Sequence, residues 1–427
     1  MHSDKQLRLL FISQSFYPHT GGVSSYLWTL TRHLTRQGHY AAVYHLSSDN
    51  TVTYSRVDGV DVYHGPFNGI GGKTLAGYIE LKERMYLANH GFERRDLYPP
   101  DLPAYSDYQD VNREMGRDIT ALSKELNIAL IHAHDFQLVE LHHWLPSSVP
   151  RILTWHNPLP APATRQYSTY LREHFNAYNA LFFLTEEVYM HAKDLKLDQP
   201  NLYVVPPLID VDMFRPDPTD RDRSRVRLGL KADELAVVCP QRFDAKSNHD
   251  QLLNGIHKVM RELDGLCLLL AGGASFTQKV SSIRHEYTES IRARVREWGL
   301  ADRVRFLEPI NYEDMPSLYR ASDIVTVLSQ QECFGLTVTE AMASERPVLG
   351  SDVGGIRLQI ESGVTGMLVP VGDIGATAHA LLNLARDDDL RAQLGLRARM
   401  SVLKRFNTLD LVSQHVARYR EVIETSV

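Results

Sequence analysis

The stretch DIVTVLSQQECFGLTVTEAMASERPVLGSDVGG, residues 323–355, carries the pattern that decides the fold. The apolar run at 323–330 predicts a buried strand, and QECFG after it predicts a loop. LTVTEAMASE predicts a helix that begins near Gly335, and RPVLGSD predicts the next strand. Strand, helix and strand in this order are typical of a parallel sheet with helices on both faces.

The same alternation extends outward over the whole chain. Before residue 215 the predicted strands are LRLLFIS, AAVYHLSS, VDVYHGP, LNIALIHAHD, RILTWHNP, ALFFLTEE and NLYVVPP. After it they are LAVVCPQR, LCLLLAGG, RVRFLEP, DIVTVLSQ, RPVLGSD and GMLVPVG. PPLIDVDMFRPDPTDRDRSR between the two series is rich in proline and charge, which is typical of an interdomain linker. The fold class that follows is α/β, with two doubly wound domains in tandem.

The predicted domains are residues 1–215, joined by an amphipathic C-terminal helix at 408–427, and residues 216–407. Within the first domain, residues 67–118 are too long for an ordinary connection between elements. Insertions of this kind are often functional lids or disordered segments, so we expect this one to shape a ligand pocket.

Composition limits the partners and the compartment. A net charge of −6 gives no basic footprint, so we expect no nucleic acid partner. MHSDKQLRLLFIS has too short an apolar run for a signal peptide, and no apolar stretch reaches 18 residues, so we expect a cytoplasmic protein without integral membrane contact. Cys239, Cys267 and Cys333 form no CxxC pair, which fits a reducing compartment and argues against a structural zinc site.

Ligands of open α/β sheets bind outside the carboxyl ends of the strands. The polar residues that end the predicted strands are therefore candidates for a site in a cleft between the two domains. In the first domain these candidates are Tyr17, Gly21, Gly22, His134, Asp135, His156 and Asn157. In the second domain they are Arg242, Lys246, Gly272, Gly273 and the stretch quoted above.

Each candidate has a structural alternative. Gly21 and Gly22 open a helix, where bare amides bind anions, but a tight turn needs the same residues. Neither G-x-G-x-x-G nor G-x-x-x-x-G-K-[ST] occurs, which disfavours dinucleotide and P-loop chemistry. Arg242 and Lys246 can neutralise a pyrophosphate, or they are ordinary surface charges. His156 can donate to a phosphate or a substrate hydroxyl, or it is structural.

Glu332 and Glu340 stand eight positions apart around the predicted start of the helix. A helix N-terminus attracts negative groups through its free amides and its dipole. Glu332 can reach a ligand that lies over this terminus, and Glu340, more than one turn later, meets another part of it. Carboxylates accept strongly from paired hydroxyls, so a nucleotide sugar fits both. The alternative is a helix with exposed acids.

E-x-F-G-L-x-x-x-E at Glu332 to Glu340, preceded by SDIVTVLS and followed by AMASERPVLGSDVGG, resembles the retaining glycosyltransferase family that includes sucrose and trehalose synthases and bacterial mannosyltransferases. FISQSFYPHTGGVSSYLWTLTRHLTRQGH, YVVPPLIDVDMFRP and ESGVTGMLVPVGD are also similar to that family, so the resemblance covers nearly the whole chain. RFDAK is similar to the trehalose-synthase type of Arg-Phe-Asp loop, one residue shorter before Lys246. The resemblance implies the GT-B fold, two facing Rossmann-like domains around a cleft.

The resemblance also implies roles for single residues. Glu340 would hold the ribose, Glu332 the transferred sugar, and Gly22 would approach the diphosphate. Arg242, Lys246 and His156 would join Glu332 as catalytic residues. Further donor-binding residues would be Gly21, Gly272, Gly273, Ile310, Phe334, Gly335, Leu336 and Thr337. Acceptor-binding residues would be Tyr17, His134, Asp135 and Asn157.

The activity implied is transfer from a nucleoside-diphosphate sugar, with UDP or GDP favoured, to a soluble small-molecule acceptor with retention. No cofactor and no metal are expected, and Asp210-Val211-Asp212 is interpreted as a chance match to a metal motif. The alternatives are a nucleotide-sugar epimerase or hydrolase of the same fold and a non-catalytic two-domain sugar-binding protein. The sequence leaves the donor, the acceptor and the oligomeric state open, a homodimer included.

Overall fold

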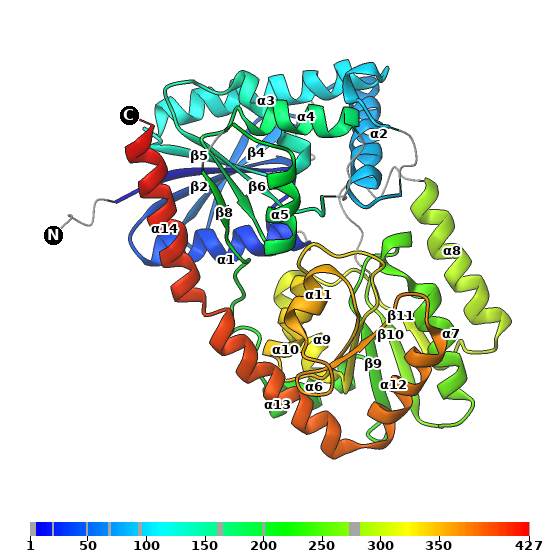
Figure 1. Cartoon of the computed structure of the whole chain (residues 1–427). Coiled ribbons are helices and arrows are strands. Elements are labelled where there is room, and N and C mark those ends of the chain that lie inside the picture. Colours follow the sequence, from blue (N-terminus) through cyan, green and yellow to red (C-terminus); the bar gives the residue numbers. More distant parts are fainter. Residues whose placement is uncertain are drawn as a thin grey trace. The chain divides into compact units, whose positions relative to one another are not determined.

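A computed structural model describes residues 6–18, 21–47, 50–66, 70–92, 96–159, 165–198, 201–272 and 282–426. The chain divides into two compact units (Figure 1). The first unit comprises Met1–Tyr17, Val23–Leu208 and Leu409–Val427, and the second comprises Pro18–Gly22 and Ile209–Thr408. Each unit is built around its own β-sheet.

The sheet of the first unit has eight strands in the order β3-β4-β2-β1-β5-β6-β7-β8. All neighbouring strands are parallel except β3 and β4, which form an antiparallel pair at one edge. The strands are β1 (Arg8–Ser13), β2 (Tyr40–Ser47), β3 (Thr53–Val57), β4 (Val60–Pro66), β5 (Leu130–His134), β6 (Arg151–Trp155), β7 (Ala180–Phe183) and β8 (Leu202–Val204). Sequence analysis predicted all of these strands except β3.

The helices of the first unit cover both faces of this sheet (Figure 1). They are α1 (Gly22–Arg36), α2 (Gly72–Asn89), η1 (Pro99–Asp101), α3 (Tyr105–Glu125), η2 (Phe136–Leu138), η3 (Leu141–Trp144), α4 (Arg165–Phe175), α5 (Glu186–Asp194) and α14 (Thr408–Thr425). On one face, Tyr26 of α1 and Tyr419 of α14 pack near the histidines of β5. On the other face, Trp155 packs edge-on against Phe175 of α4.

The expectation of an irregular connection over residues 67–118 is wrong. Of the described residues, 72–89 and 105–118 lie in α2 and α3, which pack against each other. Tyr108 and Met115 of α3 are buried, and Tyr44 of β2 donates a 2.7 Å hydrogen bond to Asp118. The apolar positions of α3 are separated by many polar residues, so its helical periodicity was missed in the sequence.

The sheet of the second unit has six parallel strands in the order β11-β10-β9-β12-β13-β14. The strands are β9 (Leu235–Cys239), β10 (Leu266–Leu270), β11 (Val304–Phe306), β12 (Ile324–Val327), β13 (Val348–Ser351) and β14 (Met367–Val369). These are the six strands predicted from the sequence. The helices are α6 (Pro218–Arg227), η4 (Ala245–Ser247), α7 (His249–Met260), α8 (Ser282–Glu297), η6 (Tyr312–Asp314), α9 (Met315–Ala321), α10 (Leu336–Ala343), α11 (Gly354–Gln359), α12 (Ile374–Arg386) and α13 (Asp388–Arg405).

Successive residues of a central strand supply two different hydrophobic cores. Val237 and Cys239 of β9 join a cluster with α7 and α12, whereas Ala236 and Val238 join a second cluster with α9. A strand whose two faces are both buried must be apolar throughout, which explains the unbroken run LAVVC. The α/β class predicted from the sequence is therefore confirmed in both units.

The segment interpreted as a linker is partly helical. Pro218–Arg227 forms α6, whose N-cap Asp217 accepts from the amide of Asp220. Proline at the first helical position and an acidic N-cap favour a helix start, so the same residues that indicate a linker begin α6. Within the described residues, no helix is both long and apolar enough to cross a bilayer.

Candidate functional site

In the second unit the chain starts its sheet in the middle, which creates a topological switch point. It begins at β9, continues outward through β10 and β11, and returns to the other side of β9 with β12. In open α/β sheets, ligands bind in a crevice outside the carboxyl ends of the strands at such a point, here next to the loops that follow β9 and β12. The first loop holds Arg242 and Lys246, and the second holds Glu332.

The two loops are bonded to each other. Lys246 Nζ lies 3.3 Å from each carboxylate oxygen of Glu332. The amide of Gln330 donates to the carbonyl of Lys246 at 2.8 Å. Both side chains of the ion pair are mostly covered, with 13% of Lys246 and 17% of Glu332 exposed. The structure thus brings two sequence-predicted site residues together, although 86 positions separate them.

Two further residues that the sequence analysis missed hold Glu332. Ser329 Oγ donates to Glu332 Oε2 at 3.2 Å, and Gln241 Nε2 donates to Ser329 Oγ at 2.7 Å. Gln241 follows β9 and Ser329 follows β12, so the chain of bonds again crosses the switch point. Their position immediately after predicted strands was the signal available in the sequence.

Gly354 and Gly355 allow their own backbone to contact the backbone of residues 332–334. A Cβ at Gly354, whose φ is +39°, would lie 2.1 Å from the carbonyl oxygen of Glu332. A Cβ at Gly355 would lie 2.3 Å from Cα of Phe334, and the amide of Gly355 donates to the carbonyl of Glu332 at 3.0 Å. The glycine pair therefore fixes the loop that carries Glu332.

Gly335 is the N-cap of α10 and has a φ of +86°, a left-handed conformation that suits glycine. Gln359 Nε2 donates to the carbonyl of Phe334 at 2.6 Å, which anchors the same turn. Phe334 is buried against Phe406, whereas Leu336 and Thr337, the first residues of α10, are half-buried. The amides at the start of α10 point away from the helix and carry partial positive charge, which favours an anionic ligand.

Glu340 lies on α10 and is 6% exposed. Its Oε2 accepts a 2.7 Å hydrogen bond from the hydroxyl of Tyr319. Burial raises the pKa of Glu340 to about 7, and the Tyr319 hydrogen bond opposes this rise. A carboxyl group whose pKa is shifted toward neutrality by burial is a recognised mark of functional sites. The sequence predicted Glu340 but not its partner Tyr319.

The other candidates of the second unit lie around the Arg242 loop. Gly272 packs closely against Phe243, and a Cβ at this position would lie only 2.4 Å from the Phe243 ring. Arg242 is half-buried, and Ile310 is half-buried against a hydrophobic cluster of this unit. Gly273 lies outside the described residues.

The first unit has an equivalent switch point between β1 and β5, from which its sheet extends in both directions. The loop after β1 contains Tyr17, which stacks on Trp28 with ring centroids 4.3 Å apart. A Cβ at Gly21 or Gly22 would meet no described atom within 4 Å. Packing within the described chain therefore does not require these two glycines, in contrast to Gly354 and Gly355.

The loops after β5 and β6 bond to each other through Asp135. Its Oδ1 accepts from Nδ2 of Asn157 at 2.5 Å and from the amide of His156 at 3.3 Å. Asp135 has a φ of +78°, which is strained for a residue with a side chain. Burial raises the pKa of Asp135 to about 6. Strained, buried acids of this kind cluster at functional sites.

His134 and His156 meet in the same place, with Nδ1 of His134 3.1 Å from Nε2 of His156. His134 is fully buried, whereas His156 is half-buried and lies nearer the surface. Burial lowers the pKa of His156 to about 3, so the ring is neutral at pH 7. The two rings are tilted toward each other with centroids 5.3 Å apart, and His134 is the more deeply buried of the two.

Sequence reasoning missed a buried group that attaches α14 to the sheet. Nδ1 of His132 lies 3.0 Å from the hydroxyl of Tyr419, and Nε2 of His415 lies 2.7 Å from the hydroxyl of Tyr26. Polar residues at alternate positions of β5, His132 and His134, were the available signal, because alternate residues share one face.

Asp210 and Asp212 have a structural role in the backbone. Asp210 Oδ1 accepts from the amides of Asp212 at 3.1 Å and Met213 at 2.9 Å, as in an Asx turn. The three cysteines are buried, and they form no disulfide with one another. These contacts account for the Asp210 side chain without a ligand.

Two family models match the chain in succession. Residues 20–213 match the model described as Glycosyltransferase Family 4, and residues 220–401 match the model described as Glycosyl transferases group 1. The D-inositol 3-phosphate glycosyltransferase of Mycobacterium tuberculosis is 35% identical over 189 residues, which are 44% of this chain and 37% of that protein. The chain thus spans little more than a third of the curated relatives that it matches.

Two solved structures agree with the fold over nearly the full chain. Sucrose-phosphate synthase from Thermosynechococcus elongatus is 20% identical with a TM-score of 0.76, and the match covers 98% of this chain and 100% of that one. HepE of Anabaena, solved in complex with UDP and glucose, is 17% identical with a TM-score of 0.70 and coverages of 97% and 100%. These neighbours confirm the predicted GT-B type of fold.

Proposed function

Because this chain belongs to the glycosyltransferases of family 4 and group 1, we propose that it transfers a sugar from a nucleoside-diphosphate sugar to a small acceptor with retention of anomeric configuration. The observation that carries the proposal is the Lys246–Glu332 pair, 3.3 Å apart, beside the N-terminus of α10. This arrangement puts a cation, a carboxylate and free helical amides at one switch point, where a sugar diphosphate has complementary groups.

In this proposal the second unit binds the donor. Glu340 accepts from the ribose hydroxyls, and Glu332 accepts from a hydroxyl of the transferred sugar. The diphosphate lies over the amides at the start of α10, with Gly335, Leu336 and Thr337 around it. Gly272, Gly273, Ile310 and Phe334 complete this proposed set of donor-binding residues.

Arg242 and Lys246 supply the positive charge for the chemical step. As the bond between the anomeric carbon and the leaving oxygen breaks, the electron pair goes to the diphosphate, where these two cations stabilise it. The acceptor oxygen bonds to the anomeric carbon on the face that the diphosphate leaves, and its proton goes to a diphosphate oxygen, which gives retention. In this scheme two cationic side chains do the work for which other transferases use a metal ion, so we propose that the reaction is metal-independent.

The predicted N-terminal domain, residues 1–215 with 408–427, is proposed to bind the acceptor, and residues 216–407 the donor. His156 is the less buried member of the pair with His134 and donates to a reacting hydroxyl or phosphate. Tyr17, Asp135 and Asn157 shape the acceptor pocket, with Asp135 holding the backbone of His156. Gly21 and Gly22 leave space for the diphosphate, since no described atom lies where their side chains would be.

The printed names of the relatives guide the choice of substrates. HepE was solved with UDP and glucose, which supports UDP-glucose as the first donor to test, with GDP sugars next. Inositol phosphate and sugar phosphates are acceptors suggested by the relatives' names. A soluble polyhydroxylated small molecule is therefore the proposed acceptor class.

A two-step experiment tests the proposal. Thermal unfolding with UDP, GDP, ADP and dTDP identifies the nucleotide, and a ligand at 100 times its dissociation constant stabilises by about 2.7 kcal/mol. The matching donor is then incubated with inositol phosphate and sugar phosphates, and NMR reports the anomeric configuration of the product. Inversion, or the isolation of an epimerised sugar, contradicts retaining transfer.

A further inference from the structure

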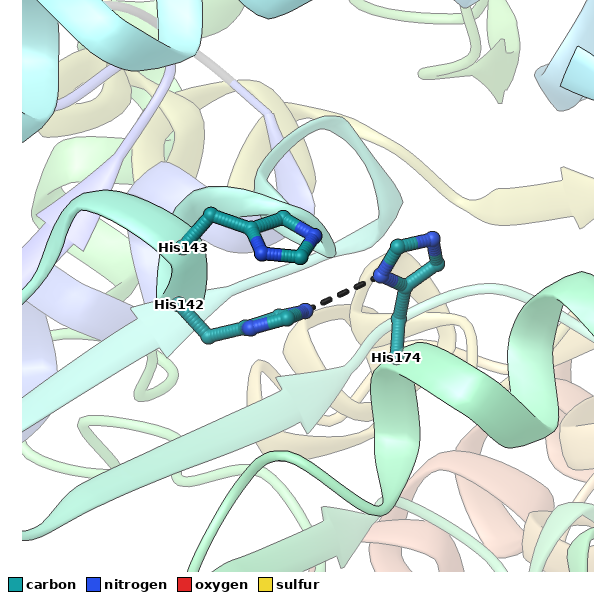
Figure 2. A group of neighbouring side chains, drawn as sticks. All are labelled: His142, His143 and His174. Atoms are coloured by element: carbon teal, nitrogen blue, oxygen red, sulfur yellow. Dashed lines mark hydrogen bonds between the residues drawn. The ribbon is translucent and has the colours of Figure 1, made fainter. Parts of the chain in front are cut away.

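Three histidines of the first unit lie together outside the proposed site (Figure 2). His142 and His143 are neighbours on η3, and His174 lies near the end of α4. One ring nitrogen from each lies within 4.8 Å of the other two. Arg151, the first residue of β6, donates to the carbonyl of His142 at 3.0 Å, so the group lies near the amino ends of the strands. The proposed substrate residues lie at the carboxyl ends.

The spacing of the three rings suits one small cation. Nitrogen ligands at 2.0–2.1 Å from tetrahedral Zn²⁺ stand roughly 3.3 Å apart. Nε2 of His142 and Nδ1 of His174 are 2.9 Å apart and must separate slightly (Figure 2). His143 is exposed, and its ring contacts that of His142 with centroids 4.1 Å apart, so it can turn toward the ion from the solvent side.

The environment of His174 resembles the second shell of a zinc site. Its Nδ1 faces His142, and its opposite nitrogen, Nε2, lies 3.6 Å from Oε1 of Glu140. Histidine ligands of metals generally direct their second nitrogen to a carboxylate or carbonyl, which fixes the tautomer that presents a lone pair to the ion. Glu140 is positioned to have this effect on His174.

Glu140 is fully buried, and its carboxylate accepts hydrogen bonds from three side chains. It accepts from the hydroxyls of Tyr170 at 2.7 Å and Tyr105 at 3.0 Å, and from Nε2 of Gln109 at 3.2 Å. These three donors are neutral side chains. A divalent ion on the far side of His174 would supply the positive charge that a buried carboxylate ordinarily requires.

The two buried histidines, His142 and His174, already share a hydrogen bond between the nitrogens that would face the ion. With the Nε2 proton of His174 directed to Glu140, Nδ1 of His174 accepts from His142. Coordination then needs only a shift of the His142 proton from Nε2 to Nδ1.

We propose that His142, His143 and His174 bind one Zn²⁺ ion, with Glu140 positioning His174 and a water molecule as the fourth ligand. Imidazole nitrogens suit zinc, and three histidines with an open position form an established zinc geometry. Such an ion would link η3 to α4 and stabilise the first unit. This proposal is independent of the proposed transferase activity, because none of its residues has a role there.

Zinc binding by the full chain, without a histidine tag, tests the site. Calorimetry with Zn²⁺ should give one ion per chain, and Co²⁺ should give the visible absorption of a tetrahedral complex. His143→Asn should weaken binding by at least about 10-fold and remove the cobalt bands. His379→Asn removes an equally exposed histidine from the second unit and should change neither. Both replaced residues are exposed, so both variants should fold.

A wild-type chain that binds no zinc, or a His143→Asn variant that binds it as tightly as His379→Asn does, overturns the site. Glu140→Gln tests the positioning step. Its zinc dissociation constant should rise roughly 10- to 100-fold while far-ultraviolet circular dichroism reports an unchanged fold. A folded Glu140→Gln chain with unchanged zinc affinity overturns the role of Glu140. If that variant unfolds, Tyr105→Phe, which removes one donor to Glu140, serves in its place with the same expected direction.

Discussion

Lys246 and Glu332 form an ion pair, 3.3 Å apart, that joins the loops after two adjacent parallel strands. The pair means that neither side chain is isolated before a ligand arrives. In the proposed reaction, Lys246 turns toward the diphosphate and Glu332 toward a sugar hydroxyl. The ion pair therefore holds both groups at the edge of the crevice and prevents either charge from being buried alone.

The two glutamates should affect different kinetic constants. Glu340→Gln should raise the donor KM with a smaller change in kcat, because it removes binding made equally in the ground and transition states. Glu332→Gln should lower kcat, because a misplaced sugar costs rate. Calorimetry with the nucleoside diphosphate alone should show weaker binding to Glu340→Gln and nearly normal binding to Glu332→Gln. Equal weakening in both variants would refute this division.

Nucleotide binding should weaken below pH 7 because of Glu340. Its pKa is raised to about 7 by burial, and only the ionised form accepts from two ribose hydroxyls. The dissociation constant should therefore rise up to about 10-fold per pH unit below 7. Glu340→Gln is the control that loses this slope between pH 6.5 and 8. Tyr319→Phe removes the opposing hydrogen bond and should move the midpoint to higher pH, and an unshifted midpoint would contradict the assignment to Glu340.

Gly354→Ala should destabilise the second unit more than Gly372→Ala does. Both glycines have positive φ, +39° and +80°, so both substitutions carry a backbone cost of roughly 1–2 kcal/mol. A Cβ at Gly354 also meets the carbonyl of Glu332 at 2.1 Å, whereas one at Gly372 meets no described atom within 4 Å. The extra clash should add about 1–3 kcal/mol, measured by urea unfolding. Equal losses of unfolding free energy in the two variants would show that the loop of Glu332 relaxes around the added Cβ, and would contradict this prediction.

The first unit should lose stability as the pH falls from 7 to 5. Burial lowers the pKa of several of its histidines, among them His132, His134, His156 and His415. The unfolded chain then binds more protons below pH 6.5, and each histidine costs up to about 2 kcal/mol at pH 5. Asp135 opposes this, because its pKa is raised to about 6 and its protonation favours the folded state as the pH falls. Thermal unfolding at the two pH values measures the balance, and equal melting temperatures would contradict the expectation.

Transferase activity should survive EDTA. Arg242 and Lys246 stabilise the leaving diphosphate in the proposed reaction, so no ion has to be supplied with the donor. A chelator should instead lower the melting temperature by removing zinc from His142, His143 and His174. Assays below that temperature, with and without EDTA, separate the two effects. Loss of activity that only magnesium or manganese restores would contradict the role of the two cations.

The sequence by itself determined the class of fold and the position of most strands. Buried parallel strands are short, continuous apolar runs, and that property is local, so LAVVC and IVTV identify β9 and β12 without any contact information. Residues that end such runs lie at the carboxyl edge of the sheet by the geometry of parallel strands. Arg242, Lys246 and Glu332 therefore became candidates from their positions in the sequence.

Only the tertiary structure decided which of these residues touch. Three contacts depend on segments that are separated in the sequence and are brought together by the order of the strands. They are those of Lys246 with Glu332, of Tyr319 with Glu340, and of Gly354 with the carbonyl of Glu332. The same reason conceals β3, which is half-exposed and paired at an edge, and the histidines of η3 and α4, which are 31 positions apart at their closest. Local periodicity records which face of an element is buried, but the partner across the core is set by packing.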